Sequence, residues 1–163
     1  MAKILDGRSL AQDIRSEVTV GVAEIQQKHG VTPGLAAVLV GDDPASTIYV
    51  RNKRRACAEV GMFSDSFTLP WDTDQGEVLA LIDQLNSDDR FHGILVQLPL
   101  PPQIDTQKII ESTNPSKDVD GIHPYNVGKL LQGRPDFIPG TPAGIQQILL
   151  RNCLLYTSDA ADE

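Results

Sequence analysis

The sequence contains few of the residues that mark several large protein classes. Its 163 residues include two cysteines, Cys57 and Cys153, which make neither a disulfide framework nor a zinc-binding spacing. The three histidines are scattered, so we expect no metal site. The longest apolar runs are about six residues, whereas a membrane-spanning helix needs about 20. The N-terminus also lacks the apolar core of a secretory signal. These shortages favour a reduced, cytoplasmic setting without a membrane partner.

Positive charge is scarce as well. The chain has 14 Lys and Arg against 22 Asp and Glu, which gives a formal net charge of -8. An acidic chain is a poor nonspecific partner for nucleic acid or for an anionic membrane, so we expect neither. Aromatic residues make up 5% of the chain and hydrophobic residues 40%. Aliphatic side chains must therefore dominate the core.

The apolar pattern predicts alternating helices and strands. Apolar residues recur at helical spacing from Leu10 to Ile25, and Gly30 and Pro33 end that helix. Strands are expected at 34–40, 63–69 and 93–97, and further helices at 44–60, 74–85, 106–112 and 142–152. The first and third strands are continuously apolar, which is typical of strands buried on both faces. The alternation predicts an α/β fold with a largely parallel sheet and flanking helices.

The expected helix 44–60 carries one lysine, Lys53, on the side where its other residues are small or apolar. At 100° per residue, small or apolar side chains fall on one side of this helix. They are Ala45, Ser46, Tyr49, Ala56, Cys57 and Val60. Lys53 falls within that stripe, whereas Arg51, Arg54 and Arg55 fall opposite. Two interpretations fit: Lys53 extends past Tyr49 into water, or it lies in a cleft with its ammonium partly desolvated.

Polar residues near the strand ends favour the cleft. In parallel α/β sheets, ligands bind outside the carboxyl ends of the strands. One strand ends just before the helix that carries Lys53, and Gln97 ends another, so the two side chains should converge. A glutamine there needs hydrogen bonds, which a role in capping the sheet would also supply. Asp118 and Asp120 follow in a loop, where Asp120-Gly121 is equally consistent with a simple turn.

The composition changes after Asn114, where loop-like segments become frequent. We expect a domain boundary near Gly121, with one domain at 1–121 and the start of a second at 122–152. The tail 153–163 resembles a translated sequencing-library adapter, so we exclude it from the predicted fold.

Four motifs, in order, carry a resemblance to a known family. They are Ser46-Thr-Ile-Tyr49-Val-Arg-Asn-Lys53, Gly93-Ile-Leu-Val-Gln97-Leu-Pro-Leu-Pro101, Lys117-Asp118-Val-Asp120-Gly121 and Pro139-Gly-Thr-Pro-Ala-Gly144. Together they are similar to the motifs of bifunctional methylenetetrahydrofolate dehydrogenase/cyclohydrolases, over about residues 2–151. The resemblance implies that the chain stops before most of a Rossmann-type NADP-binding domain. It also implies that the first domain lacks its C-terminal strand and helix.

The resemblance implies an enzyme of one-carbon metabolism that acts on tetrahydrofolate derivatives. Such enzymes oxidise methylenetetrahydrofolate with NADP and hydrolyse the methenyl product to formyltetrahydrofolate. Lys53 would be the central catalytic group, Tyr49 would stack on the folate, and Gln97 would hydrogen-bond near Lys53. Asp120 would bind the pterin. The remaining substrate-binding positions would be Ser46, Pro99 and Gly121.

The same resemblance implies a homodimer and no metal, with NADP held by a glycine-rich segment that this chain does not contain. Two other functions remain open. One is a non-catalytic folate-binding or interaction module on the same scaffold. The other is a monofunctional dehydrogenase of the family, although the presence of both Lys53 and Gln97 favours the bifunctional form.

Overall fold

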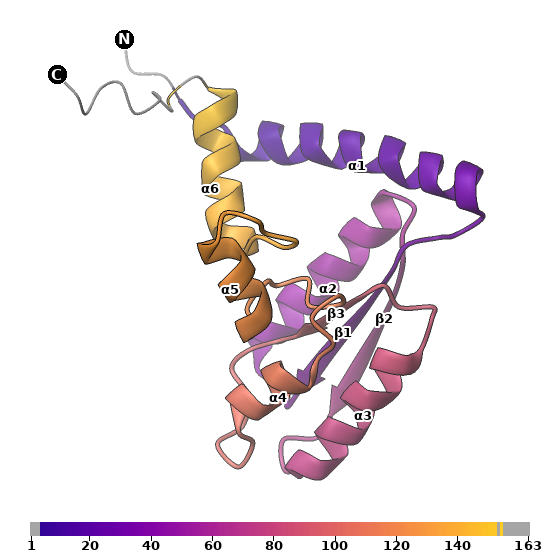
Figure 1. The fold of residues 1–163 in the computed structure, drawn as a ribbon, viewed down its shortest axis with the longest axis vertical. Coiled ribbons are helices and arrows are strands. Elements are labelled where there is room, and N and C mark those ends of the chain that lie inside the picture. The colour runs from indigo at the N-terminus through magenta and orange to yellow at the C-terminus, as the bar shows by residue number, and fades with distance from the viewer. Residues whose placement is uncertain (1–3, 153, 155–163) are drawn as a thin grey trace, which may run out of the picture.

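The structure is a computed structural model that describes residues 4–152 and 154, so nearly all of the predicted tail lies outside the described residues. Helices and strands alternate along the first two thirds of this range (Figure 1). They are α1 (Gly7–His29), β1 (Gly34–Val40), α2 (Pro44–Glu59), β2 (Phe63–Leu69), α3 (Gln75–Ser87), β3 (Gly93–Val96), α4 (Thr106–Ser112), α5 (Pro124–Leu131) and α6 (Gly140–Arg151).

The three strands form one parallel sheet in the order β2-β1-β3. Gly34 of β1 pairs with Phe63 of β2, and Leu35 pairs with Gly93 of β3. Every residue of β1 except Leu35 is buried, as its continuous apolar run predicts. Gly34 is required at its position because a Cβ there would lie 2.0 Å from the carbonyl oxygen of Arg90. The predicted α/β fold with a parallel sheet is thus confirmed.

One face of the sheet carries most of the core. Helices α3 and α4 cover it, and their apolar side chains meet alternate residues of β1. The cluster consists of Ala36, Val38, Val40, Val78, Ile82, Leu85, Phe91, Ile94, Ile104 and Ile109, all buried. Phe91 completes it with ring contacts to Phe63 and Phe67, whose centroids lie 5.6 and 5.7 Å away. This side of the molecule resembles the interior of an ordinary α/β domain.

Within the described residues, the opposite face is covered mainly by α2, and its buried cluster consists of Ala37, Leu39 and Val50. Helix α1 lies over α2 rather than on the sheet and extends beyond it (Figure 1). Of its 23 residues, only Val22 is buried. It ends where Gly30 adopts a left-handed conformation with φ 67°, which favours glycine. This side of the sheet is therefore thinly covered.

Several predicted details were wrong. Helix α5 was not predicted, because its sequence contains Pro124 and Gly128 and its one buried residue is the polar Asn126. Helix α6 begins two residues earlier than predicted, and β3 ends at Val96 rather than Gln97.

On α2, Ala45 and Tyr49 are exposed and Val50 is buried, so the face that packs on the sheet is rotated from the predicted stripe. None of the helices within residues 4–152 combines the length and apolarity needed to cross a membrane.

Candidate functional site

A cavity of about 380 Å³ lies beside the carboxyl end of β3. Four parts of the chain form its walls: α2, the end of β3 with the residues after it, the loop before α5, and the start of α6. The lining residues are Lys53, Val96, Gln97, Leu98, Asp120, Ile122, Pro139, Gly140, Thr141 and Pro142. Its place at the end of a parallel strand is where α/β sheets bind ligands.

Lys53 and Gln97 meet in this cavity. The Nζ atom of Lys53 donates a hydrogen bond to the amide oxygen Oε1 of Gln97 over 3.4 Å. The amide nitrogen of Gln97 donates to the carbonyl oxygen of Leu98 over 2.8 Å, and this bond turns Oε1 towards the lysine. The backbone N–H of Gln97 donates to the carbonyl of Val38, which anchors the residue to the central strand. Lys53 therefore reaches the cleft rather than the water beyond Tyr49.

The peptide segment that carries Asp120 is attached to the edge of β3. The N–H of Ile94 donates to the carbonyl of Lys117 over 2.7 Å, and Ile94 also forms a parallel bridge with Asp118. Gly121 then turns the chain with φ 65°, and it is buried against the backbone of residues 137–139. Because the loop is fixed at both ends, Asp120 is held against the cavity.

The carboxyl group of Asp120 is half-buried, and its surroundings affect its charge. Burial raises the pKa of Asp120 above its usual value, and the negative charge of Asp118 raises it further. The positive charge of Lys53 opposes both effects. The cavity thus holds the amino group of Lys53 and the carboxyl group of Asp120, whose charges influence each other. The amide of Gln97 connects Lys53 to the central strand.

Comparisons with known proteins identify the family of the chain. Residues 5–120 match the model of the tetrahydrofolate dehydrogenase/cyclohydrolase catalytic domain. The chain belongs to this family. It is 57% identical over 149 residues to the bifunctional protein FolD of Geotalea uraniireducens, covering 91% of this chain and 53% of that protein.

Two solved structures extend the comparison. The bifunctional methylenetetrahydrofolate dehydrogenase/cyclohydrolase from Campylobacter jejuni is 45% identical, with a TM-score of 0.90, and the match covers 93% of this chain and 54% of that chain. The enzyme from Trypanosoma brucei, complexed with NADP cofactor and inhibitor, is 35% identical with a TM-score of 0.89, over 93% and 52%. This family member therefore spans about half the length of the relatives that it matches.

The structure brings together some of the predicted site residues and not others. Lys53, Gln97 and Asp120 line one cavity. Tyr49 is 60% exposed and lies one helical turn before Lys53 on α2, outside the cavity lining. The other three predicted positions also lie outside the lining: Ser46 is buried with its N–H bonded to Asp43, Pro99 is exposed, and Gly121 is buried behind Asp120.

Sequence reasoning did not assign a role to the start of α6. Pro139, Gly140, Thr141 and Pro142 nevertheless form one wall of the cavity. The sequence signal was the motif that begins at Pro139, which carries no charged side chain and so suggested no chemistry. Asn126 was also missed, although its side chain lies buried against Asp118.

The described residues do not form a site for NADP. A dinucleotide site needs a glycine-rich turn from a strand into a helix, so that backbone N–H groups face the pyrophosphate. The connections after β1, β2 and β3 have no such glycine pattern. Each instead has an aspartate at the helix N-cap, namely Asp43, Asp74 and Asp105, whose side chain accepts from one or two N–H groups of the first turn. Within residues 4–152 we also find no cluster of side chains that could hold a metal ion.

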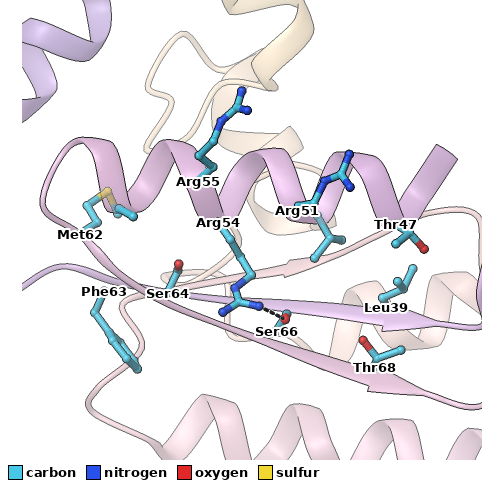
Figure 2. A pocket seen from close by; sticks show the side chains of 12 residues that line it. Leu39, Thr47, Arg51, Arg54, Arg55, Met62, Phe63, Ser64, Ser66 and Thr68 are labelled. Carbon is cyan, nitrogen blue, oxygen red and sulfur yellow. Dashed lines mark hydrogen bonds between the residues drawn. The ribbon is translucent and has the colours of Figure 1, made fainter. Parts of the chain in front are cut away.

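A second, larger hollow of about 600 Å³ lies between α2 and β2, and it has a different character. Figure 2 shows that Arg54 points down to the strands, where it bonds the hydroxyl of Ser66 over 3.2 Å. Arg51 and Arg55 point away from the strands in the same view. The floor consists of hydroxyl and apolar groups, and it contains none of the predicted site residues. This hollow, called the α2–β2 groove below, therefore offers no acid–base pair.

Proposed function

We propose that this chain carries the folate site of a bifunctional methylenetetrahydrofolate dehydrogenase and methenyltetrahydrofolate cyclohydrolase. The observation that supports this most directly is the single cavity that collects Lys53, Gln97 and Asp120 from three segments of the chain. Solved relatives whose names include both activities support it as well. A binding module would not need an amine held beside an amide oxygen and opposite a carboxyl group.

The cavity suits the pterin of a folate. The aminopyrimidinone edge of a pterin presents parallel N–H donors, which one carboxylate can accept as a pair. Asp120 would supply that carboxylate from the wall opposite Lys53. Tyr49, exposed on the same helix as Lys53, would stack its ring on the conjugated system once the ligand enters. Ser46, Pro99 and Gly121 would support these contacts from the two adjoining segments.

The hydrolytic step needs a group that takes a proton from water. Water attacks the methenyl carbon, a carbon–oxygen bond forms, and Lys53, after it has released its own proton to solvent, accepts the proton that the water loses. One of the two carbon–nitrogen bonds then breaks, and Lys53 returns the proton to the departing nitrogen. The hydroxyl proton leaves as the formyl group forms, so one water is consumed and one proton is released. Gln97 orients Lys53 through the bond to Oε1.

The oxidative step would use NADP, which accepts the hydride when bound to residues beyond those described. The contribution of this chain to that step is to hold the folate in one orientation. We further propose that the intact protein is a cytoplasmic homodimer, on the grounds of the family resemblance and the acidic composition.

The proposal can be tested in a chimera. Residues 1–152 of this chain would be joined to the remaining C-terminal part of the Geotalea uraniireducens relative, and methenyltetrahydrofolate hydrolysis measured. We expect turnover in the chimera and a loss of at least about 100-fold in Lys53→Met, as is typical when a general acid–base group is removed. Lys108→Met, which replaces an exposed lysine on α4, is the matched control and should leave turnover unchanged.

Two results would contradict the proposal. One is near-normal hydrolysis in a folded Lys53→Met chimera, which would place the catalytic centre elsewhere. The other is a folded chimera that neither turns over methenyltetrahydrofolate nor binds 5-formyltetrahydrofolate by calorimetry, which would remove the folate site altogether.

A further inference from the structure

Asp118 is a buried carboxylate that the proposed reaction does not use. Its exposed fraction is 5%. Its oxygen Oδ2 accepts two hydrogen bonds of 2.8 Å, one from the backbone N–H of His123 and one from the side-chain amide of Asn126. Both donors are neutral, and no cationic side chain among the described residues forms an ion pair with it. Burying a charge that only neutral donors contact costs free energy of folding. A functional role for Asp118 would explain why the residue lies there.

Asn126 ties this carboxylate to the neighbouring helix. Its amide nitrogen donates to Asp118 and also to the carbonyl of Pro115, over 2.9 Å. Because Asn126 lies in α5 and Pro115 lies before Asp118, these bonds join the two ends of the segment that contains Asp120. The backbone bridge between Asp118 and Ile94 fixes the same segment to β3.

Asp120 lies between Asp118 and the candidate site. A second, much smaller cavity, with room for about one water molecule, is lined by Ile94, Val96, Ile110, Thr113, Asp118, Asp120 and Ile122. Asp120, Val96 and Ile122 therefore line both this cavity and the one that contains Lys53. Across the two cavities the charged side chains are Lys53, Asp118 and Asp120, and the other lining residues are uncharged. The Nδ1 atom of the nearby His123 accepts a hydrogen bond from the backbone N–H of Tyr125. Its Nε2 atom lies 3.4 Å from the carbonyl oxygen of Glu111.

We propose that Asp118 is a positioning residue, which holds Asp120 at the cleft and places a second negative charge behind it. This rests on the proposed function, in which Asp120 binds the pterin. The charge of Asp118 raises the pKa of Asp120, in the same direction as burial and against Lys53. Since ionised Asp120 accepts the pterin donors, folate binding weakens as pH falls through the pKa of Asp120. Asp118 thus moves the acid limit of folate binding to higher pH.

The first test follows the Asp120 carboxyl carbon by NMR as pH is changed, and it needs no folate. In Asp118→Asn the amide oxygen can still accept the bonds from His123 and Asn126, but the charge is gone. We expect the titration midpoint of Asp120 to move to lower pH in Asp118→Asn and to stay near its original pH in Asp118→Glu. Asp72→Asn neutralises an exposed aspartate that lines neither cavity and should leave the midpoint unchanged.

An unchanged midpoint in folded Asp118→Asn would overturn the inference, because a purely structural role would alter affinity without altering the titration. If Asp118→Asn does not fold, Asp118→Ser takes its place, because serine is smaller and uncharged and still carries an oxygen that can accept a hydrogen bond. The same downward movement of the Asp120 midpoint is then expected, and an unchanged midpoint would overturn the inference.

The second test measures binding of 5-formyltetrahydrofolate to the unsubstituted chain and to Asp118→Asn between pH 4 and 8. We expect the pH of half-maximal binding to follow the NMR midpoint downwards in the variant. A chain that titrates as expected but binds no folate at any pH would contradict the proposed function and leave the coupling of the two aspartates standing. Binding whose pH limit does not move in Asp118→Asn would contradict the inference instead.

Discussion

The two faces of the sheet differ although one strand supplies both. Alternate residues of β1 point to opposite sides, and both sets are buried. On the α3–α4 face they join a cluster of ten buried residues, and on the α2 face a cluster of three. The edge strand β2 makes the same division, with Phe67 and Leu69 packed against the larger cluster and Ser66 and Thr68 lining the α2–β2 groove. The sequence of β2 therefore specifies one dry face and one polar face.

The difference separates the part of the molecule that provides stability from the part that carries the site. Helices α1 and α6 lie on the thinly covered side, and α6 has no buried residue. Val18 and Ile25 of α1 are 39% and 41% exposed, although they continue the apolar stripe of their helix. Burial of apolar side chains is the main source of stability. We therefore expect the α3–α4 face to dominate the free energy of unfolding.

The largest expected effect is the loss of Phe91, which is 1% exposed in the larger cluster. Phe91→Ala should lower the free energy of unfolding by about 3–5 kcal/mol, because it removes a buried ring and leaves a cavity. Phe63→Ala is the matched control, since Phe63 is 39% exposed and should cost clearly less. Urea denaturation measures both changes. Equal losses in the two variants would contradict the greater contribution expected from the fully buried ring.

A second effect concerns pH, and it has opposite signs at two aspartates. Side-chain and backbone hydrogen bonds from Arg90, together with the charges of Arg90 and Lys117, lower the pKa of Asp88, at the end of α3, to about 2 from its ordinary 3.8. Its stabilisation is therefore present above about pH 4 and is lost as pH falls to about 2. Burial raises the pKa of Asp120 above 3.8, so folding disfavours its ionised form. The ionised Asp120 therefore lowers the free energy of unfolding, and this loss of stability develops as pH rises past 3.8.

At pH 7, Asp88→Asn should therefore destabilise the chain, whereas Asp120→Asn should stabilise it. Both differences should shrink as pH is lowered, which thermal unfolding at several pH values would reveal. If both substitutions shifted stability in the same direction at pH 7, the contrast would not hold between Asp88, whose charge stabilises the fold, and Asp120, whose charge destabilises it.

A smaller effect is expected from polar substitution on α1. Val18→Ser removes a side chain that is already partly exposed, and such surface changes usually stay within about 0.5 kcal/mol. Val22→Ser, at the one buried position of the helix, should cost more. Urea denaturation of the two variants would show whether α1 contributes through Val22 alone. A loss at Val18 as large as that at Val22 would indicate that the apolar stripe is covered in solution.

The smallest effect should come from the ion pair that joins α1 to α6. Arg151 donates to both carboxylate oxygens of Glu17, over 2.5 and 2.8 Å, and the pair is exposed to water. Water and salt screen such pairs. Glu17→Gln should leave the melting temperature unchanged within error at physiological salt. A measurable drop would show that α6 depends on this contact to stay against α1.

The sequence predicted the sheet better than the site. The three predicted strands match the observed ones to within one residue, with continuous apolar runs locating β1 and β3, and the spacing of apolar residues located α1 and α3. Lys53 and Gln97 could be paired from a helical wheel and a strand end, because both patterns follow from regular backbone geometry. The burial of α2 was less predictable, since which side of a helix packs on the sheet depends on partners far away in sequence. Tyr49 of the predicted stripe is exposed and Val50 is buried for that reason.

The remaining parts of the site lie in segments where polar groups decide the structure. Helix α5 packs through Asn126 rather than through an apolar stripe, and hydropathy gives no signal for such a contact. The wall formed by Thr141 and Pro142 depends on Gly121, whose turn brings residues 137–139 close to Asp120. Contacts of this kind arise from loop geometry and cannot be inferred from periodicity.

The central position of β1 also bears on the order in which the chain acquires its structure. During synthesis β1 leaves the ribosome before both of its neighbours, β2 follows after one helix, and β3 after another. The segment with Asp118 and Asp120 can dock only on a β3 that is already paired, and α6 arrives later still. Local pairings form before distant ones because they close shorter loops. The cleft is therefore the last part of this fold to assemble, and the sheet beneath it can form before any residue of its far wall has been made.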